Sequence, residues 1–131
     1  MKKNNTILRV ENLKVYFYND YGQELKAVDD ISFQVKKGET LALVGESGCG
    51  KSVTSLALLR LIDSNGKIVD GKIFFNNCDL LSITEKQMQN IRGKDISMIF
   101  QEPSSALNPV YTIGDQIIEA IILHQKVFYR E

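Results

Sequence analysis

Gly45-Glu46-Ser47-Gly48-Cys49-Gly50-Lys51-Ser52 is the stretch of the chain that decides its fold. It has the spacing of a phosphate-binding loop: glycine, four residues, glycine, lysine, and then serine or threonine. The stretch follows the apolar run 41–44 and precedes a segment with helical spacing, which is the strand, loop and helix context that the motif requires. A glycine-rich turn that matches by chance is expected in roughly one chain in two hundred of this length. The stretch therefore predicts an α/β fold with a phosphate site.

The residue types in this loop suit the binding of phosphate oxygens. Its glycines let the backbone turn amide groups inward, because no Cβ stands in the way, and the following helix directs its positive end to the same place. Lys51 supplies a mobile charge for the outer phosphates, and the hydroxyl of Ser52 is suited to bind Mg²⁺. Cys49 stands where the spacing tolerates any small residue, so we interpret it as a packing residue and not as a catalytic thiol.

Three segments ahead of the loop have strand patterns. In residues 8–17 the apolar positions alternate, with a bulge expected near Asn12, and we predict an exposed edge strand. Residues 31–35 alternate in the same way after turn residues at 19–22, so the two segments predict an antiparallel front sheet. Residues 40–44 contain four consecutive apolar side chains and leave no face for solvent. This pattern predicts a central, parallel strand that is covered on both sides.

Downstream of the loop, strands and helices are expected to alternate. The periodicity predicts a largely buried helix over 52–62 that stops at 63–66, a strand over 72–75, and a short helix over 84–91 with Thr84 as its N-cap. A buried strand is predicted over 96–100 and a last helix over 112–125. The apolar face of that helix comprises Ile113, Ile117, Ala120 and Ile121, with His124 at its edge.

Composition excludes several classes of protein. Sixteen basic residues balance sixteen acidic ones, so the chain lacks the positive excess that nucleic acids attract, and we expect no nucleic-acid partner. Hydrophobic residues make up 44% of the chain, as in globular proteins. The N-terminal residues lack the apolar stretch of a secretory signal, and no apolar run approaches the 20 or so residues that span a bilayer. Cys49 and Cys78 have no metal-ligand spacing and suit a reducing cytoplasm.

The flanks of the loop carry a family resemblance. Residues 27–33 (Ala-Val-Asp-Asp-Ile-Ser-Phe) and 38–52, in this order and spacing, look like the ATPases of the ABC transporter family. Ile96-Ser97-Met98-Ile99-Phe100-Gln101-Glu102-Pro103, followed by Leu107-Asn108-Pro109, resembles the glutamine loop of that family. Within the family, the loop with Cys49 and the segment 107–109 are most similar to oligopeptide and dipeptide importers.

This resemblance implies a fold and a function. The fold would be that of a P-loop NTPase, an ABC-type nucleotide-binding domain, incomplete and with an antiparallel front sheet. Residues 1–131 would form its N-terminal part, from the phosphate loop to the glutamine loop and the start of the helical subdomain. The implied cofactors are ATP and Mg²⁺, and hydrolysis would drive the import of a solute such as a peptide. The implied partners are transmembrane permease subunits and a second ATP-binding subunit, at the cytoplasmic face of the cell membrane.

Two further site residues carry over from the resemblance. Phe17 matches the aromatic residue that stacks on adenine, although core packing with Leu13 and Val15 is an equal alternative. Gln101 matches the glutamine that contacts Mg²⁺ and the attacking water, and the alternative is an ordinary polar loop residue. Lys51 and Gln101 are thus the implied catalytic residues, Ser52 and Gln101 the implied metal ligands, and Phe17 with Gly45, Glu46, Ser47, Gly48, Cys49, Gly50, Lys51 and Ser52 the implied nucleotide contacts.

Other parts of the family pattern do not occur in these residues. The sequence contains no Leu-Ser-Gly-Gly-Gln signature, no apolar strand ending in Asp-Glu, and no histidine after such a strand, since His124 falls in the last predicted helix. We expect a truncated gene or a shortened polypeptide. A non-catalytic remnant and a soluble ABC-type ATPase without a transporter are the alternative functions. A third alternative is a small NTPase in which Glu102 supplies the missing carboxylate, although Pro103 and the resemblance favour a glutamine loop.

Overall fold

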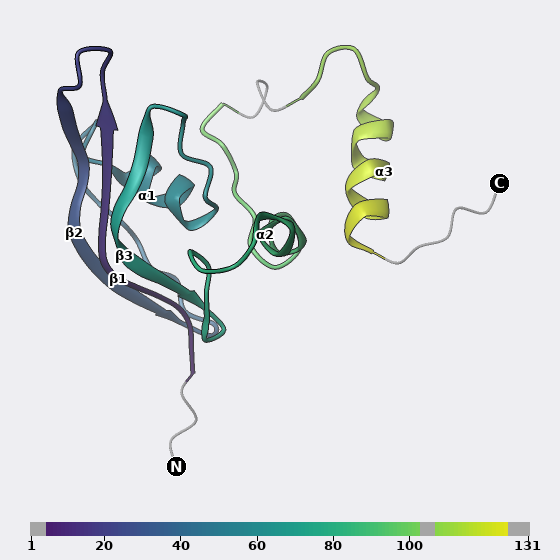
Figure 1. The fold of residues 1–131 in the computed structure, drawn as a ribbon. Helices are drawn as coiled ribbons and strands as arrows, with labels where there is room; N and C mark the ends of the chain where they lie inside the picture. Colours follow the sequence, from purple (N-terminus) through teal and green to yellow (C-terminus); the bar gives the residue numbers. More distant parts are fainter. Residues whose placement is uncertain (1–4, 103–106, 126–131) are drawn as a thin grey trace. The chain divides into compact units, whose positions relative to one another are not determined.

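The computed structural model describes residues 5–102 and 107–125, which form two compact units. The first ends at Thr84 and the second begins at Glu85, and each is described by itself. A four-stranded antiparallel sheet of order β2-β1-β3-β4 forms the body of the first unit (Figure 1). Its strands are β1 (Thr6–Tyr18), β2 (Glu24–Lys36), β3 (Gly66–Phe75) and β4 (Cys78–Asp79). The predicted antiparallel front sheet is therefore confirmed.

The place of β1 in this sheet differs from the prediction. β1 pairs with β2 along one edge and with β3 along the other, so it is an interior strand and the predicted edge position is wrong. Its alternation arises because one face is buried, not because one edge is free: Val10, Leu13 and Val15 are buried. An alternating pattern reports which face is covered and carries no information on how many neighbours a strand has.

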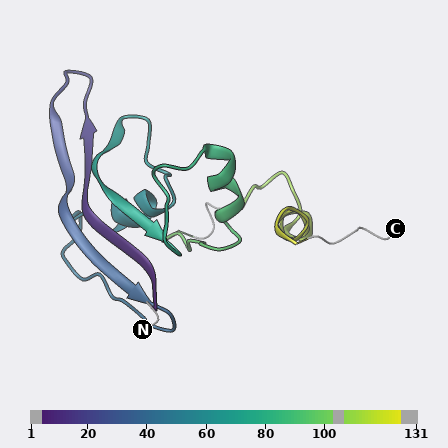
Figure 2. The same cartoon turned by 60° about the horizontal axis from the view of Figure 1, so that its bottom comes forward.

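The helix α1 (Lys51–Leu58) lies on one face of this sheet and packs against β1 and β2 (Figure 2). Thr54 and Ala57 on α1 are buried, and the hydroxyl of Thr54 donates to the carbonyl of Gly50 at 2.9 Å. The buried residues of this unit are Val10, Leu13, Val15, Val28, Gly50, Thr54, Ala57, Leu59, Ile73 and Leu80. The core thus lies between α1, β1, β2 and β3, and it anchors the start of the helix to the sheet.

The helix α1 ends at Leu58, four residues before the predicted end at Ile62. Arg60 has a left-handed φ of 54°, its amide donates to Ala57 at 3.0 Å, and the amide of Leu61 donates to Leu56 at 2.9 Å. These two bonds form a Schellman motif, which terminates helices and usually has glycine at the left-handed position. The arginine side chain compensates by donating to the carbonyl of Ile83 at 2.8 Å.

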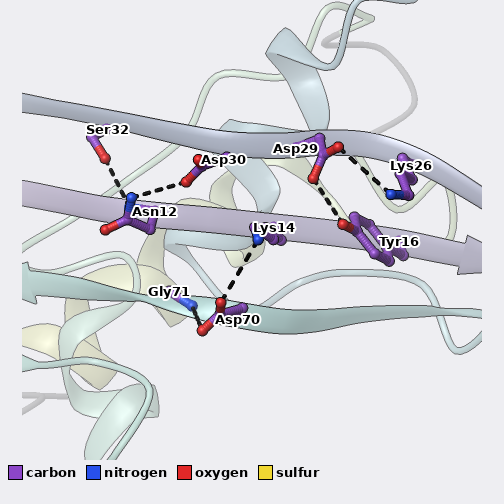
Figure 3. Close-up of polar contacts among 9 residues, drawn as sticks. All are labelled: Asn12, Lys14, Tyr16, Lys26, Asp29, Asp30, Ser32, Asp70 and Gly71. Atoms are coloured by element: carbon purple, nitrogen blue, oxygen red, sulfur yellow. Dashed lines mark hydrogen bonds and ion pairs between the residues drawn. The ribbon is translucent and has the colours of Figure 1, made fainter.

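A bulge lies near Asn12, as predicted, where the pairing of β1 and β2 shifts register between Val10 and Leu13. Asn12 has a φ of 47°; its side-chain amide donates to Asp30 at 2.9 Å, and its backbone amide donates to the hydroxyl of Ser32 at 2.8 Å (Figure 3). These side-chain bonds replace ladder bonds that the bulge interrupts.

A row of polar side chains continues along the same region of the sheet (Figure 3). The Tyr16 hydroxyl donates to Asp29 at 2.7 Å, and the ammonium group of Lys26 lies 3.8 Å from the same carboxylate. Lys14 lies 3.9 Å from Asp70 on β3. The hydrogen bond to Asp29, followed by desolvation and nearby negative charge, raises the pKa of Tyr16 from 10 to about 12, so its phenol stays protonated further into the alkaline range than an ordinary tyrosine. By alternation, Lys14 and Tyr16 point away from the buried face that carries Val15.

Gly71 faces the bulge from β3, and we expect its replacement by alanine to destabilise the sheet. Its φ is 105°, and an added Cβ would lie 2.6 Å from the Cα of Leu13, a backbone atom that cannot turn aside. Gly71→Ala is expected to lower the free energy of unfolding by about 2 kcal/mol or more. Gly22→Ala is the matched control, because Gly22 has a φ of 75° but nothing within 4 Å of the added methyl. Its expected cost is about 1 kcal/mol. Urea unfolding of both variants tests this, and equal losses would show that crowding at β1 is unimportant.

Two predicted strands are absent from the described residues. The runs 40–44 and 96–100 form no strand, and only a single bridge joins Arg92 to Ile96. Val44 is 90% exposed and Ile99 is 91% exposed. An apolar run becomes a central parallel strand only when strands pair with both of its edges, and within residues 5–102 and 107–125 neither run joins the sheet. The predictions of a buried central strand over 40–44 and of a buried strand over 96–100 are therefore wrong for the described residues.

The second unit contains α2 (Glu85–Ile91) and α3 (Ile113–His124), at the predicted positions. Thr112 caps α3: its hydroxyl accepts from the amide of Asp115 at 3.1 Å and donates to the carboxylate of that residue at 2.7 Å. Met88 of α2 is buried, whereas no residue of α3 is. Among the described residues, no helix combines the length and the apolar character needed to cross a bilayer.

Candidate phosphate-binding site

The predicted phosphate loop leads directly into α1 and is seated on β2. Gly48 and Gly50 have φ values of 81° and 89°, and Gly50 is the N-cap residue of α1. A Cβ on Gly50 would collide with the carbonyl oxygen of Ala27 and would lie 3.3 Å from the Cγ2 of Val28. Gly50 therefore needs to be glycine for two reasons, its left-handed conformation and the close approach of β2.

The ammonium group of Lys51 lies over the loop. It donates to the carbonyl of Gly45 at 2.8 Å and to the carbonyl of Glu46 at 2.6 Å, and it lies 3.3 Å from the sulfur of Cys49. The ammonium group thus bridges the first two residues of the loop and Cys49 near its end. The ammonium group has three donor hydrogens, so it can exchange these oxygens for those of a phosphate that enters the loop.

Amide groups at the start of α1 add donors to the same place. The first hydrogen bond of the helix runs from the amide of Thr54 to the carbonyl of Gly50 at 2.8 Å, so the amides of Lys51, Ser52 and Val53 precede the helical ladder. The loop from Glu46 to Cys49 is exposed, and so is Ser52, whose hydroxyl is the predicted Mg²⁺ ligand. An exposed loop, a helix N-terminus and one lysine are together suited to a multiply charged anion.

Cys49 packs against the first glycine of the loop. A Cβ on Gly45 would lie 2.5 Å from the sulfur of Cys49, so the thiol occupies the space that the missing side chain leaves. Both cysteines, Cys49 and Cys78, are free thiols. This contact favours the packing interpretation of Cys49 and gives a reason for glycine at position 45.

Phe17 lies near the end of β1 on the face of the sheet that carries the loop. Val15, two residues earlier, pairs with Val28, and Val28 lies against Gly50. Residues two apart on a strand share a face and lie about 7 Å apart, so Phe17 follows Val15 on the buried side. Phe17 is half-buried. Packing in the core and stacking on a base both fit this position, and its role stays a prediction.

Gln101 belongs to the second unit, where it is exposed beside the exposed Glu102. Pro103, which entered the glutamine-loop prediction, lies outside the described residues. Further along, the side chain of Gln116 donates to the carbonyl of Asn108 at 3.0 Å and accepts from the amide of the same residue at 2.9 Å. Segment 107–109 is thus held by the helix that follows it. The roles of Gln101 in binding Mg²⁺ and in catalysis remain predictions.

Three residues make close approaches that the sequence did not predict, although residue 62 was placed in the predicted helix and residue 66 in its stop. The carbonyl of Ala27 closes the space above Gly50, and a methyl group of Ile62 and the ring of Phe17 fill the space above Gly66. Such approaches leave no motif in the sequence. The only available signal was the glycine at position 66 in an otherwise normal strand, since an isolated glycine in a strand indicates a close approach. His124 is half-buried, and a Cβ on Gly93 would lie 2.7 Å from its Nε2.

Comparison with known proteins points to one family. The family model described as "ABC transporter" matches residues 28–128. The oligopeptide transport ATP-binding protein AppD of Bacillus subtilis (strain 168) is 51% identical over 127 residues, which are 96% of this chain and 38% of that protein. The dipeptide transport ATP-binding protein DppD of Escherichia coli (strain K12) is 50% identical over 119 residues, 91% of this chain and 36% of the relative. The chain therefore spans little more than a third of the length of these relatives.

Two further comparisons extend this result. The glutathione import ATP-binding protein GsiA of Salmonella typhimurium (strain LT2) is 47% identical over 131 residues, covering 95% of this chain and 21% of that protein. Among solved structures, a dimeric ATP-binding cassette in a post-hydrolysis state, bound to ADP and Pi, superposes with a TM-score of 0.79 at 20% identity. That match covers 94% of this chain and 50% of the other.

Proposed function

Because the chain belongs to the ABC transporter family, we propose that residues 45–52 bind the phosphates of ATP in a subunit that powers transport across a membrane. The fold is that of part of an ABC-type nucleotide-binding domain, as predicted. The observation that carries the proposal is the position of Lys51: its ammonium group lies within the curve of the loop at the N-terminus of α1, 2.6–2.8 Å from two loop carbonyls. This arrangement presents one cation and a set of amides to a single anionic group.

The proposed cofactors are ATP and Mg²⁺. The structural relative was solved with ADP and Pi, which supports a nucleotide at the same loop here. Ser52 in the first turn of α1 would hold Mg²⁺ by its hydroxyl, and Gln101 would contact the metal and the attacking water. The ion would neutralise charge on the β- and γ-phosphates, while Lys51 and the loop amides hold the phosphates in place.

The proposed cargo is a peptide, and the proposed partners are other subunits. The relatives in Bacillus and Escherichia are oligopeptide and dipeptide transport ATP-binding proteins, which supports peptide import as the process that this chain powers. It would act with transmembrane permease subunits and a second ATP-binding subunit, without nucleic acid, at the cytoplasmic face of the cell membrane. The structural relative is dimeric, which supports a paired arrangement.

Capture of the tagged protein from its host's membranes tests the transport role. We expect permease subunits with many transmembrane segments to co-purify, and uptake of a labelled dipeptide to fall when Lys51 is replaced. A soluble ABC-type ATPase would remain in the soluble fraction without such partners, and its loss would leave peptide uptake unchanged. A remnant without activity would bind partners or nucleotide weakly and would give no uptake phenotype with the Lys51 variant.

Phe17→Ala separates base stacking from core packing. If the ring stacks on adenine, the variant should lose about 1 to 3 kcal/mol of affinity for ATP and little for inorganic tripolyphosphate, which has no base. Titration calorimetry with both ligands measures the two losses. Val15→Ala is the control, because Val15 is buried on the same strand and has no exposed surface for a base. If Phe17→Ala weakens both ligands equally, Phe17 is a core residue only.

A further inference from the structure

Gly66, the first residue of β3, is a glycine for which the backbone gives no reason. Its φ lies outside the left-handed region, so an alanine could adopt the same conformation. The space above its Cα is nevertheless filled: an added Cβ would lie 2.7 Å from the Cε1 of Phe17, 3.0 Å from the Cδ1 of the same ring, and 2.5 Å from the Cγ2 of Ile62. The ring of Phe17 therefore occupies the volume that any other residue at position 66 would need.

The backbone on both sides of this contact is fixed. Phe17 and Gly66 are directly paired in the ladder between β1 and β3. The amide of Tyr18 donates to the carbonyl of Asn65 at 2.8 Å, and the amide of Gly66 donates to the carbonyl of Asp63 at 2.8 Å. Because neither strand can retreat, a side chain at position 66 would have to turn the ring. An aromatic ring laid over a cross-strand glycine is a known way to fix the ring and cover the bare backbone.

The contact covers one side of the Phe17 ring and leaves the rest of the ring available to a ligand. One side of the ring lies over Gly66, where a methyl group of Ile62 fills the same space, while Phe17 as a whole is only half-buried, so part of the ring remains open to solvent. The same face of the sheet carries Val15 and Val28, and Val28 touches the loop residue Gly50. A nucleotide whose phosphates lie in the loop would find the exposed part of this ring on the same side of the sheet. The angle of the ring then decides how well a flat base stacks on it.

We propose that Gly66, together with Ile62, is a positioning residue that sets the angle of the Phe17 ring for stacking on the base of a nucleoside triphosphate. This inference rests on the proposed function, in which Phe17 contacts the base. Gly66 lies on β3 and Phe17 on β1. Gly66 would thus contribute to the affinity for the base through Phe17, without touching the nucleotide.

The test compares ligands with and without a base. For the purified protein we expect Gly66→Ala to weaken ATP about fivefold or more, the loss expected for a disturbed stack, and to leave the affinity for inorganic tripolyphosphate unchanged. In a Phe17→Ala background the same substitution should have no further effect on ATP, because the ring it would turn is gone. Gly114→Ala is the matched control, since its added methyl meets nothing closer than 3.7 Å, and both affinities should stay at the wild-type value.

Each other outcome would overturn the inference. If Gly66→Ala leaves the ratio of the two affinities unchanged while Phe17→Ala alters it, base stacking stands and the positioning role of Gly66 is wrong. If neither variant alters the ratio, the ring does not meet the base and both ideas fail. Should Gly66→Ala not fold, as judged by thermal melting, Ile62→Ala decides, because it removes the methyl group that shares the space over Gly66 with the ring and so lets the ring turn. An unchanged ratio in that variant would also reject the proposal.

Discussion

Lys51→Ala is expected to lower the affinity for ATP by about a hundredfold or more. The ammonium group would form charge-assisted hydrogen bonds to the outer phosphates, and each such bond contributes about 1.5 to 3 kcal/mol. In the structure the same group already bridges the carbonyls of Gly45 and Glu46, so its loss also removes a clamp on the loop. Both effects weaken nucleotide binding. Titration calorimetry with ATP, in the presence and absence of Mg²⁺, measures the change.

Two further variants separate the charge of Lys51 from its other properties. Lys51→Met keeps most of the side-chain volume and removes the charge, so it should lose nearly as much affinity as Lys51→Ala. Lys37→Ala removes an exposed lysine in the turn after β2 and should leave ATP binding unchanged. Wild-type affinity in both Lys51 variants would disprove the assignment of residues 45–52 as the phosphate loop.

The sequence predicted the loop and most of the sheet because both follow from local patterns. The spacing of glycines and Lys51 defines the loop without reference to any neighbour. The strand patterns predicted β1, the second half of β2 and the end of β3, and the helical periodicity over 112–125 predicted α3. The ABC-type fold class, which the resemblance implied, is confirmed by the family match and the structural relative.

The errors arose where tertiary neighbours decide the outcome. The end of α1 was missed because its left-handed residue is Arg60 and not a glycine, and the compensating bond to Ile83 is 23 positions away in the sequence. The interior position of β1 depends on β3, whose paired residues lie 49 to 67 positions later in the sequence. The contact between Gly66 and Phe17 could not be predicted from the sequence for the same reason, because the two residues meet only when β1 and β3 pair. The apolar runs 40–44 and 96–100 show the opposite error. Their pattern predicts strands paired on both edges, but among the described residues no strand pairs with either run.

A polypeptide made of residues 1–131 alone is expected to lack ATP hydrolysis. In the ABC family, as the resemblance implies, a carboxylate positions the attacking water and a second copy presents its signature serine to the γ-phosphate. These residues contain no such signature and no apolar strand ending in Asp-Glu. Loss of a positioned general base typically costs a factor of 10² to 10⁴ in rate, and loss of transition-state donors costs further factors of similar size. Glu102, exposed beside Gln101, is the only carboxylate that the sequence offers as a substitute at the glutamine loop.

We therefore expect this polypeptide to bind Mg-ATP without turnover, at a rate indistinguishable from that of its Lys51→Ala variant. Phosphate release measures the rate, and calorimetry on the same sample confirms that ATP is bound, so that a misfolded preparation is not mistaken for an inactive one. Glu102→Gln is the informative third variant, because it removes a charge while keeping the shape of the side chain. Turnover that disappears in both Lys51→Ala and Glu102→Gln would contradict the expectation. It would make Glu102 the catalytic carboxylate and these residues sufficient for a small NTPase.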